Sequence, residues 1–232
     1  MSDTTKSNPA ATTRSAEIFD AIRADVLGGV FSPGERLPFA RLVDKYQCSI
    51  GSLREALQRL GEVGLVESFA QQGFRVVEIS EADLADLTQA RIEIEVTVLR
   101  HAVREGDIAW EGSAVAALHM LERTPRHAEG SSQYITEEWA TAHAAFHRTL
   151  LSGCTNRRLL GVAAQLRDAA ELYRRWSLPP VADPSHDPDR EHRELLQAAV
   201  QRDSDRAGQL LQEHIQKAAS RQRLRIPAIA VA

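Results

Sequence analysis

The chain has 232 residues, which is enough for two modest domains that each bury a core. Its formal net charge of −4 excludes a protein that coats nucleic acid with a uniformly basic surface, so any contact with DNA must come from a local patch. The two cysteines, Cys48 and Cys154, argue against a disulfide framework, and no run of 18 apolar residues predicts a membrane span or a membrane partner.

The N-terminal part of the sequence predicts a polar tail followed by three helices. Residues 1–14 are rich in Ser, Thr and Ala, have no periodicity and lack the apolar core of a secretion signal, so we expect a disordered tail on a cytoplasmic protein. Apolar residues recur at helical spacing over 15–28 and 39–46. Ser49 is a favourable N-cap residue, and it predicts the start of a third helix.

Two short runs of β-type residues follow the third helix. The runs cover 65–69 and 74–79, and the turn between them contains a glycine, which is typical of a β-hairpin. Three helices and a hairpin in this order predict a winged helix-turn-helix over residues 15–79.

The remainder of the chain has only helical periodicity. Ser80, followed by acidic residues, is suited to begin a helix, and we therefore expect a second domain over 80–222 and a tail over 223–232. The predicted fold class is mainly α, with the winged helix-turn-helix followed by an all-α antiparallel helical bundle. The helices expected in this bundle are 81–105, 108–122, 131–152, 156–177, 188–201 and 203–222.

The segment between the second helix and the hairpin carries a candidate DNA-binding surface. In a helix-turn-helix, the N-terminal residues of the second helix reach base edges in the major groove, and a wing can contact the minor groove or phosphates. The alternative is that its arginines belong to an ordinary solvated helix face. The candidate contacts with operator DNA are Arg36, Arg41, Ser49, Ile50, Gly51, Ser52, Arg54, Gln72, Gly73 and Arg75.

Four histidines form a candidate metal site in the second domain. His143 and His147 are four residues apart in HAAFH, so they share one helix face, and one ion can bind both imidazoles. His192 and His214 lie on two later helices that a bundle can bring to the same place. The alternative is a coincidental histidine pair on a solvated face.

The first domain resembles the GntR family of regulators, and within it the FadR subfamily. The resemblance rests on PGERL at 33–37, SIGSLREALQRLGEVGLVE at 49–67 and GFRVVEIS at 73–80. Where the family has Ser-Arg-Thr-Pro-Val-Arg-Glu-Ala-Leu, this sequence keeps the serine and the Arg-Glu-Ala-Leu run. Ile50 and Gly51 replace the Arg-Thr pair that commonly touches bases or phosphates in the family. The resemblance implies a homodimer that binds double-stranded operator DNA.

The second domain resembles the FCD-type effector domain of that subfamily. Members with a metal site carry Asp-x3-His and two later histidines, which correspond here to His147, His192 and His214, with His143 in place of the aspartate. A site of four imidazoles favours zinc, with nickel as an alternative. The family implies a small carboxylate effector near the metal, whereas a closed tetrahedral site would only brace the fold. The candidate effector-binding residues are Arg91, Asn156 and Arg174.

Two other classes of function start from the same features. A metal-dependent enzyme of the HExxH type would need a glutamate beside the first histidine, and HAAFH has none, so we expect no enzyme activity. An interaction module that does not bind DNA would account for the bundle but not for the hairpin. We therefore expect a transcriptional regulator, with repression relieved by the effector as the commoner outcome in the family.

Overall fold

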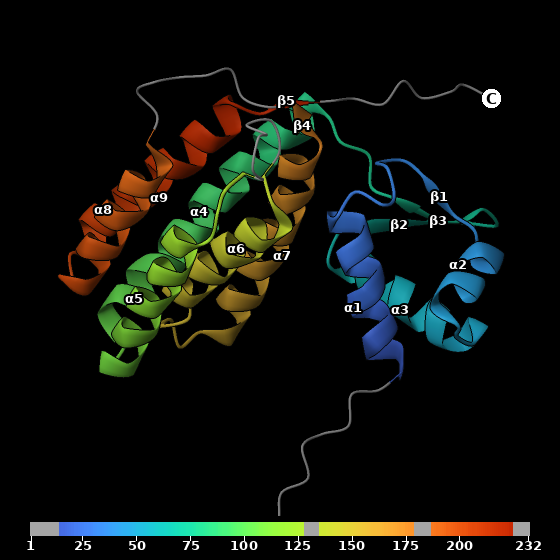
Figure 1. Cartoon of the computed structure of the whole chain (residues 1–232), viewed down its shortest axis with the longest axis horizontal. Coiled ribbons are helices and arrows are strands. Elements are labelled where there is room, and N and C mark those ends of the chain that lie inside the picture. The colour runs from blue at the N-terminus through green and yellow to red at the C-terminus, as the bar shows by residue number, and fades with distance from the viewer. Residues whose placement is uncertain (1–13, 128–134, 179–186, 225–232) are drawn as a thin grey trace, which may run out of the picture. The chain divides into compact units, whose positions relative to one another are not determined.

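A computed structural model describes residues 14–127, 135–178 and 187–224 of the chain (Figure 1). The chain forms two compact units, one containing the described residues up to Glu78 and the other beginning at Ile79. The first unit combines three helices with a small sheet, and the second is a helical bundle, as the predicted fold class requires.

The first unit is a winged helix-turn-helix. Its three strands form an antiparallel sheet in the order β1-β3-β2, in which Arg75 lies between Arg36 and Glu67. The positive φ values of Gln71 and Gly73 turn the chain between the last two strands. The elements are α1 (Arg14–Leu27), β1 (Arg36–Leu37), α2 (Phe39–Tyr46), α3 (Ile50–Glu62), β2 (Val66–Phe69) and β3 (Gly73–Val76).

A small apolar core fixes α3 in this unit. The helix packs against α1 and α2, and its residues at helical spacing, Leu53, Leu57 and Leu60, are fully buried. Ser49 caps α3, because its side chain accepts a hydrogen bond from the backbone N–H of Ser52. The buried face leaves the opposite face of α3, including its first turn, exposed to solvent.

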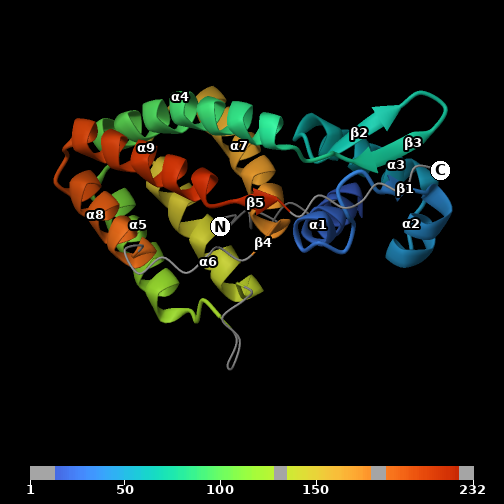
Figure 2. The same cartoon turned by 90° about the horizontal axis from the view of Figure 1, so that it is seen from above.

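The second unit is a bundle of long helices. The helix α4 packs against α9, α7 and α6, while α5 packs against α6 and α8, and both views of the ribbon show α9 running beside α4 (Figure 1, Figure 2). Two short strands, β4 (Ser177–Leu178) and β5 (Arg223–Leu224), pair antiparallel. The helices are α4 (Glu81–Glu105), α5 (Ile108–Arg123), α6 (Glu137–Leu151), α7 (Arg157–Arg175), α8 (Pro188–Val200) and α9 (Ser204–Ser220).

The structure corrects the predicted start of one helix. The sequence predicts a helix from residue 131, but α6 begins at Glu137 because Thr136 is its N-cap and accepts a hydrogen bond from the N–H of Trp139. Ile135, which we expected to be helical, instead forms a β-bridge with His127. Residues 131–134 lie outside the described part of the chain.

The two tails predicted from sequence are shorter where the structure describes them. Arg14 begins α1 instead of ending the tail, and its guanidinium donates to the backbone carbonyls of Tyr46 and Gln47. Arg223 and Leu224 form β5. The rest of both predicted tails, 1–13 and 225–232, falls outside the described residues.

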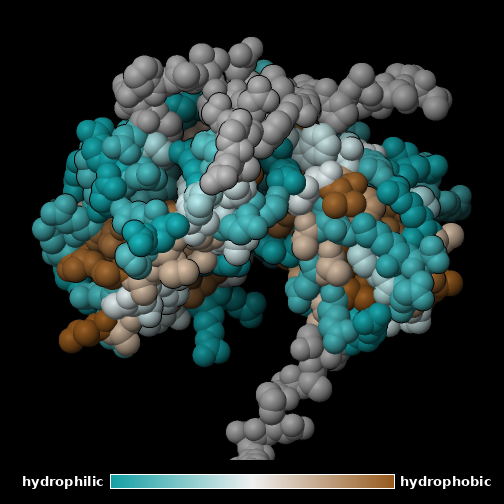
Figure 3. All heavy atoms as spheres, in the orientation of Figure 1, coloured by the Kyte–Doolittle hydropathy of each residue, from teal (hydrophilic) through white to brown (hydrophobic). Residues whose placement is uncertain are grey.

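No membrane-spanning helix is found in the described ranges. None of the helices there has both the length and the apolar composition that a bilayer crossing needs. Figure 3 shows that hydrophilic residues cover much of the visible face of each unit, with separate hydrophobic patches between them.

Candidate functional site

Three helices of the second unit bring four histidines together. His143 and His147 come from α6, His192 from α8 and His214 from α9. One ligand atom of each residue lies within 4.8 Å of the others, and the Nε2 atoms of His143 and His147 are 3.2 Å apart. His147 and His192 are almost completely buried, so the cluster lies inside the bundle and not on its surface.

Burial favours the neutral form of three of these imidazoles, those of His143, His147 and His192. Loss of water lowers the pKa of His143 and His147 well below the ordinary value, and the neighbouring histidines and Arg167 lower it further. The same desolvation, together with the charge of His214, lowers the pKa of His192 to about 3. A neutral imidazole has a free lone pair, so at neutral pH the rings of His143, His147 and His192 are in the protonation state that a metal requires.

The hydrogen bonds of the cluster are incomplete in a way that suits a metal ion. Both ring nitrogens of His192 are buried and have no hydrogen-bond partner among the described residues. The Nδ1 atom of His214 lies 2.9 Å from Oε2 of Glu191, which orients the ring and leaves Nε2 as the nitrogen available to an ion. Burying an unpaired polar nitrogen costs free energy, and coordination would remove that cost. The donor set therefore fits a transition-metal ion with nitrogen ligands.

A buried ion triad lies within electrostatic range of the cluster. Glu95 is fully buried and accepts from Arg91 Nε at 2.6 Å and from an Arg167 terminal nitrogen at 2.8 Å. Burial would raise the pKa of Glu95, but the two guanidinium groups outweigh it and lower this pKa. Two cations share one carboxylate, so the triad carries one net positive charge.

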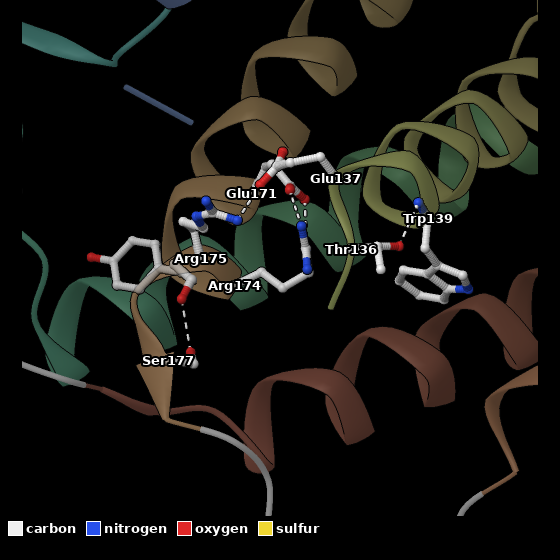
Figure 4. Close-up of polar contacts among 8 residues, drawn as sticks. Thr136, Glu137, Trp139, Glu171, Arg174, Arg175 and Ser177 are labelled. Atoms are coloured by element: carbon white, nitrogen blue, oxygen red, sulfur yellow. Dashed lines mark hydrogen bonds and ion pairs between the residues drawn. The ribbon is translucent and has the colours of Figure 1, made fainter. Parts of the chain in front are cut away.

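The other two predicted effector residues have partners of their own. Arg174 forms a two-point ion pair with Glu171 on α7, and beside it Arg175 pairs with Glu137 (Figure 4). Asn156 is the N-cap of α7, where its side-chain oxygen accepts from two backbone N–H groups. Its oxygen is therefore engaged in capping, whereas the charge of Arg174 helps to lower the pKa of His143.

Arg126 is a further cation near the cluster, and its charge helps to lower the pKa of His192. Its guanidinium lies 4.8 Å from the centre of the Trp139 ring, and that ring stacks on His143 with centroids 4.7 Å apart. The Nε atom of Arg126 is buried without a hydrogen-bond partner among the described residues. A cation with an unpaired buried donor is a candidate contact for an anion.

The first turn of α3 presents the predicted recognition residues. Ser49 and Ser52 lie at the start of the helix with hydroxyl oxygens 3.0 Å apart, and both are partly or fully exposed. Ile50 is 58% exposed and Gly51 is also exposed. The guanidinium of Arg54, one turn further on, lies 5.1 Å from the centre of the Phe39 ring. These residues therefore share one accessible face.

The wing brings further predicted DNA contacts together. The side-chain oxygen of Gln72 accepts from Arg36 at 3.3 Å and from Arg75 at 3.4 Å, so one turn residue joins two cations. Gly73 lies in the same turn. Arg41 stands apart from this group, because its guanidinium pairs with Glu35 at 2.9 Å.

A groove separates the exposed face of α3 from the wing. Arg54 and Gln58 line it from the helix, and Ser68 and Phe69 line it from the hairpin. Phe69 is 38% exposed, and the guanidinium of Arg75 lies 5.5 Å from the centre of its ring. The arginines are thus held by aromatic rings while remaining beside the groove.

Comparison with known proteins identifies both units. Residues 14–76 match the gntR family of bacterial regulatory proteins, and residues 86–217 match the FCD domain family. The chain belongs to the GntR family of transcriptional regulators, in its FCD-containing branch. Membership of a family of DNA-binding regulators sets aside the enzyme alternative.

Relatives of this GntR regulator cover most of its length. The HTH-type transcriptional repressor GlaR of Escherichia coli is 32% identical over 84% of this chain and 89% of the relative. The regulator BphR of Paraburkholderia xenovorans is 33% identical over 87% of this chain and 82% of the relative. The solved structure of McbR/YncC from E. coli has the same fold, with a TM-score of 0.75 and 19% identity over 90% of this chain and 97% of that chain.

Sequence reasoning about this GntR regulator missed Arg126 and Arg167. Arg167 meets Glu95 across 72 positions, and no local spacing signals such a contact. Arg126 follows the end of α5, and nothing in the sequence distinguishes it there from an ordinary loop arginine. The histidines were easier to find, because a pair at i and i+4 is visible in the sequence itself.

Proposed function

We propose that this GntR regulator is a dimeric repressor whose affinity for operator DNA is set by a small organic acid bound beside a divalent transition metal. The proposal rests chiefly on the cluster of four histidines, of which His147 and His192 are buried and His192 lacks any hydrogen-bond partner within the described residues. We place the protein in the cytoplasm, where operator DNA is accessible. The proposed repressor role is supported by the relative named GlaR, which is a transcriptional repressor.

Zinc is the metal that we propose, with nickel as the alternative. All four donors are imidazole nitrogens, which suit borderline ions better than the hard cations that prefer oxygen. Neutral imidazole ligands carry no negative charge, so they do not themselves reduce the charge of a divalent ion. When bound, such an ion supplies a Lewis-acid position that favours an anionic oxygen.

The effector that we propose for this histidine cluster is a small carboxylate. We propose Arg91, Arg167, Arg174 and Arg126 as the groups that favour it. The charges of Arg167, Arg174 and Arg126 act on the histidines and lower their pKa values, and Arg91 shares Glu95 with Arg167. A guanidinium can hold a carboxylate through two parallel hydrogen bonds. The alternative is a closed four-histidine site that only stabilises the bundle, and it would leave the buried Nε of Arg126, unpaired among the described residues, without a role.

Tyr173 gives a route from this site to the segment that joins the two units. It lies on α7 between Arg167 and Arg174 in sequence, and its hydroxyl donates to Asp83 at 2.5 Å and accepts from the N–H of Ser80 at 3.2 Å. Ser80 and Asp83 belong to the start of α4, directly after the winged unit. We propose that effector binding shifts α7 and changes the spacing of the two winged domains in the dimer. This mechanism requires that the effector bind more tightly to the dimer with one spacing of the winged domains than with the other.

One titration tests this function. Protein stripped with a chelator and then reloaded with zinc or nickel would be titrated with its own promoter DNA, with and without a panel of hydroxy acids, sugar acids and dicarboxylates. We expect one class of acid to weaken DNA binding at least tenfold in the reloaded protein only. Equal effects without metal would overturn the role of the metal, and no effect of any acid would overturn effector control.

A further inference from the structure

The first residue of α3 is an exposed isoleucine. Ile50 is 58% exposed, whereas Leu53, Leu57 and Leu60 on the same helix are fully buried. Single exposed apolar residues are common on proteins, so exposure alone does not indicate a function. The position of Ile50 is more informative, because the N-terminal residues of this helix are those that face base edges in a helix-turn-helix.

The next residue is a glycine that the fold does not require. Gly51 is not among the residues with positive φ, and an added Cβ would meet only the Ser49 hydroxyl oxygen, at 3.8 Å, which is an ordinary contact. Glycine in the interior of a helix is less stable than alanine by roughly 1 kcal/mol, and Gly51, in the first turn, has the same unfavourable direction with a smaller cost. The helix therefore carries a destabilising residue for which its own packing gives no reason. Bare backbone on an exposed face allows another molecule to approach closely.

The chemistry of this face indicates what approaches it. Ile50 and Arg54 are four residues apart, so they lie one turn from each other on one side of α3. This face of α3 thus combines the apolar side chain of Ile50, the backbone of Gly51 without a side chain, and the guanidinium of Arg54. The major groove offers polar base edges and phosphates to the cation, and its one apolar group is the methyl group of thymine.

We propose that Ile50 contacts the 5-methyl group of a thymine in each operator half-site, and that Gly51 lets the first turn of α3 come close enough to make that contact. This inference rests on the operator-binding role proposed above and adds how one base is chosen. It also gives Ile50 and Gly51 a joint role, since a side chain at position 51 would hold Ile50 away from the groove.

Thymine and uracil differ only in this methyl group, so exchanging them tests the contact. Full-length protein would enrich a binding sequence from a random duplex library, and each thymine of that duplex would then be replaced by uracil. We expect one thymine in each half-site at which uracil weakens binding about fourfold, the change that corresponds to about 0.8 kcal/mol for one apolar carbon. The variant Ile50→Ala should bind both duplexes equally.

Ile108→Ala is the matched control, because Ile108 is also the first residue of a helix and is 84% exposed, but lies in the other unit. This variant should keep the preference for thymine. Wild-type indifference to uracil at every position would overturn the inference while leaving operator binding intact. Failure to enrich any sequence would instead overturn the proposed function, and this inference with it.

Gly51→Ala tests the second half of the inference. The substitution should leave the melting temperature unchanged or higher, because alanine favours a helix and meets no close atom. It should weaken binding to the enriched duplex at least fourfold, since Ile50 can no longer reach the methyl group. Undiminished binding by Gly51→Ala would show that close approach at this residue is not needed.

Discussion

The two functional regions of this regulator are built in opposite ways. The predicted DNA-binding surface takes all its residues from 36–75, at helix and wing positions that are exposed or partly exposed. The histidine cluster takes its residues from three helices between 143 and 214, and each of them is buried or partly buried. Exposed residues can change binding with little effect on folding, whereas buried polar residues contribute to both. Substitutions in the two regions should therefore separate affinity from stability.

The largest effect on stability should come from removing the buried carboxylate. Glu95→Ala leaves Arg91 and Arg167 without their shared partner, and breaking a buried ion pair costs about 3–5 kcal/mol. Urea unfolding followed by tryptophan fluorescence measures this loss selectively, because Trp110, Trp139 and Trp176 all lie in the second unit.

Glu93→Ala is the control for that experiment, since Glu93 is on the same helix but exposed. It should change the free energy of unfolding by less than about 0.5 kcal/mol. Equal losses in the two variants would show that the triad does not stabilise the bundle, and the contrast between buried and exposed polar groups would then fail in this unit.

The triad of Glu95, Arg91 and Arg167 also shows which contacts can be predicted from the sequence and which cannot. The spacing of Arg91 and Glu95 indicates a helical i,i+4 pair, and the structure contains it. The second cation, Arg167, comes from another helix, and the sequence carries no local sign of that contact. The same limit explains why β1 was missed: two residues are too few for a pattern, and they form a strand only because β3 lies beside them.

The next effect concerns metal affinity. His147→Ala removes one ligand and should weaken zinc binding by at least about 100-fold, since losing even a group that supports a ligand costs about 10–100-fold. Competition with a chromophoric chelator measures this change. His119→Ala is the control because that histidine is exposed and lies outside the cluster. Equal zinc affinity of the two variants would contradict a metal site at the histidine cluster.

A smaller loss is expected on the DNA-binding surface. Arg54→Ala should weaken operator binding by about 10–100-fold, the range for a lost base contact, and leave the melting temperature nearly unchanged. Arg59→Ala is a close control: it is on the same helix, and its guanidinium lies over Phe19 as that of Arg54 lies over Phe39. Anisotropy titrations at several salt concentrations should show a loss for Arg54→Ala alone. A similar loss in both variants would indicate a general effect of charge.

The smallest effect is a pH dependence of stability in the metal-free protein. The unfolded chain protonates a histidine near pH 6.5, but burial lowers the pKa of His192 to about 3, so the unfolded state binds more protons between these values. The free energy of unfolding should therefore fall as the pH falls below 6.5, by about 0.7 kcal/mol for each such histidine between pH 7 and pH 6.

Replacing His192 by asparagine should reduce this pH dependence by the share of one histidine, whatever it does to stability at a fixed pH. His119→Asn should leave it unchanged, because that side chain is exposed. An unaltered slope in His192→Asn would mean that this ring does not stay neutral inside the bundle. Added zinc should steepen the slope in the wild type, because protons and metal compete for the same nitrogens. The predicted DNA-binding surface has no histidine among its residues, so this response belongs to the bundle alone.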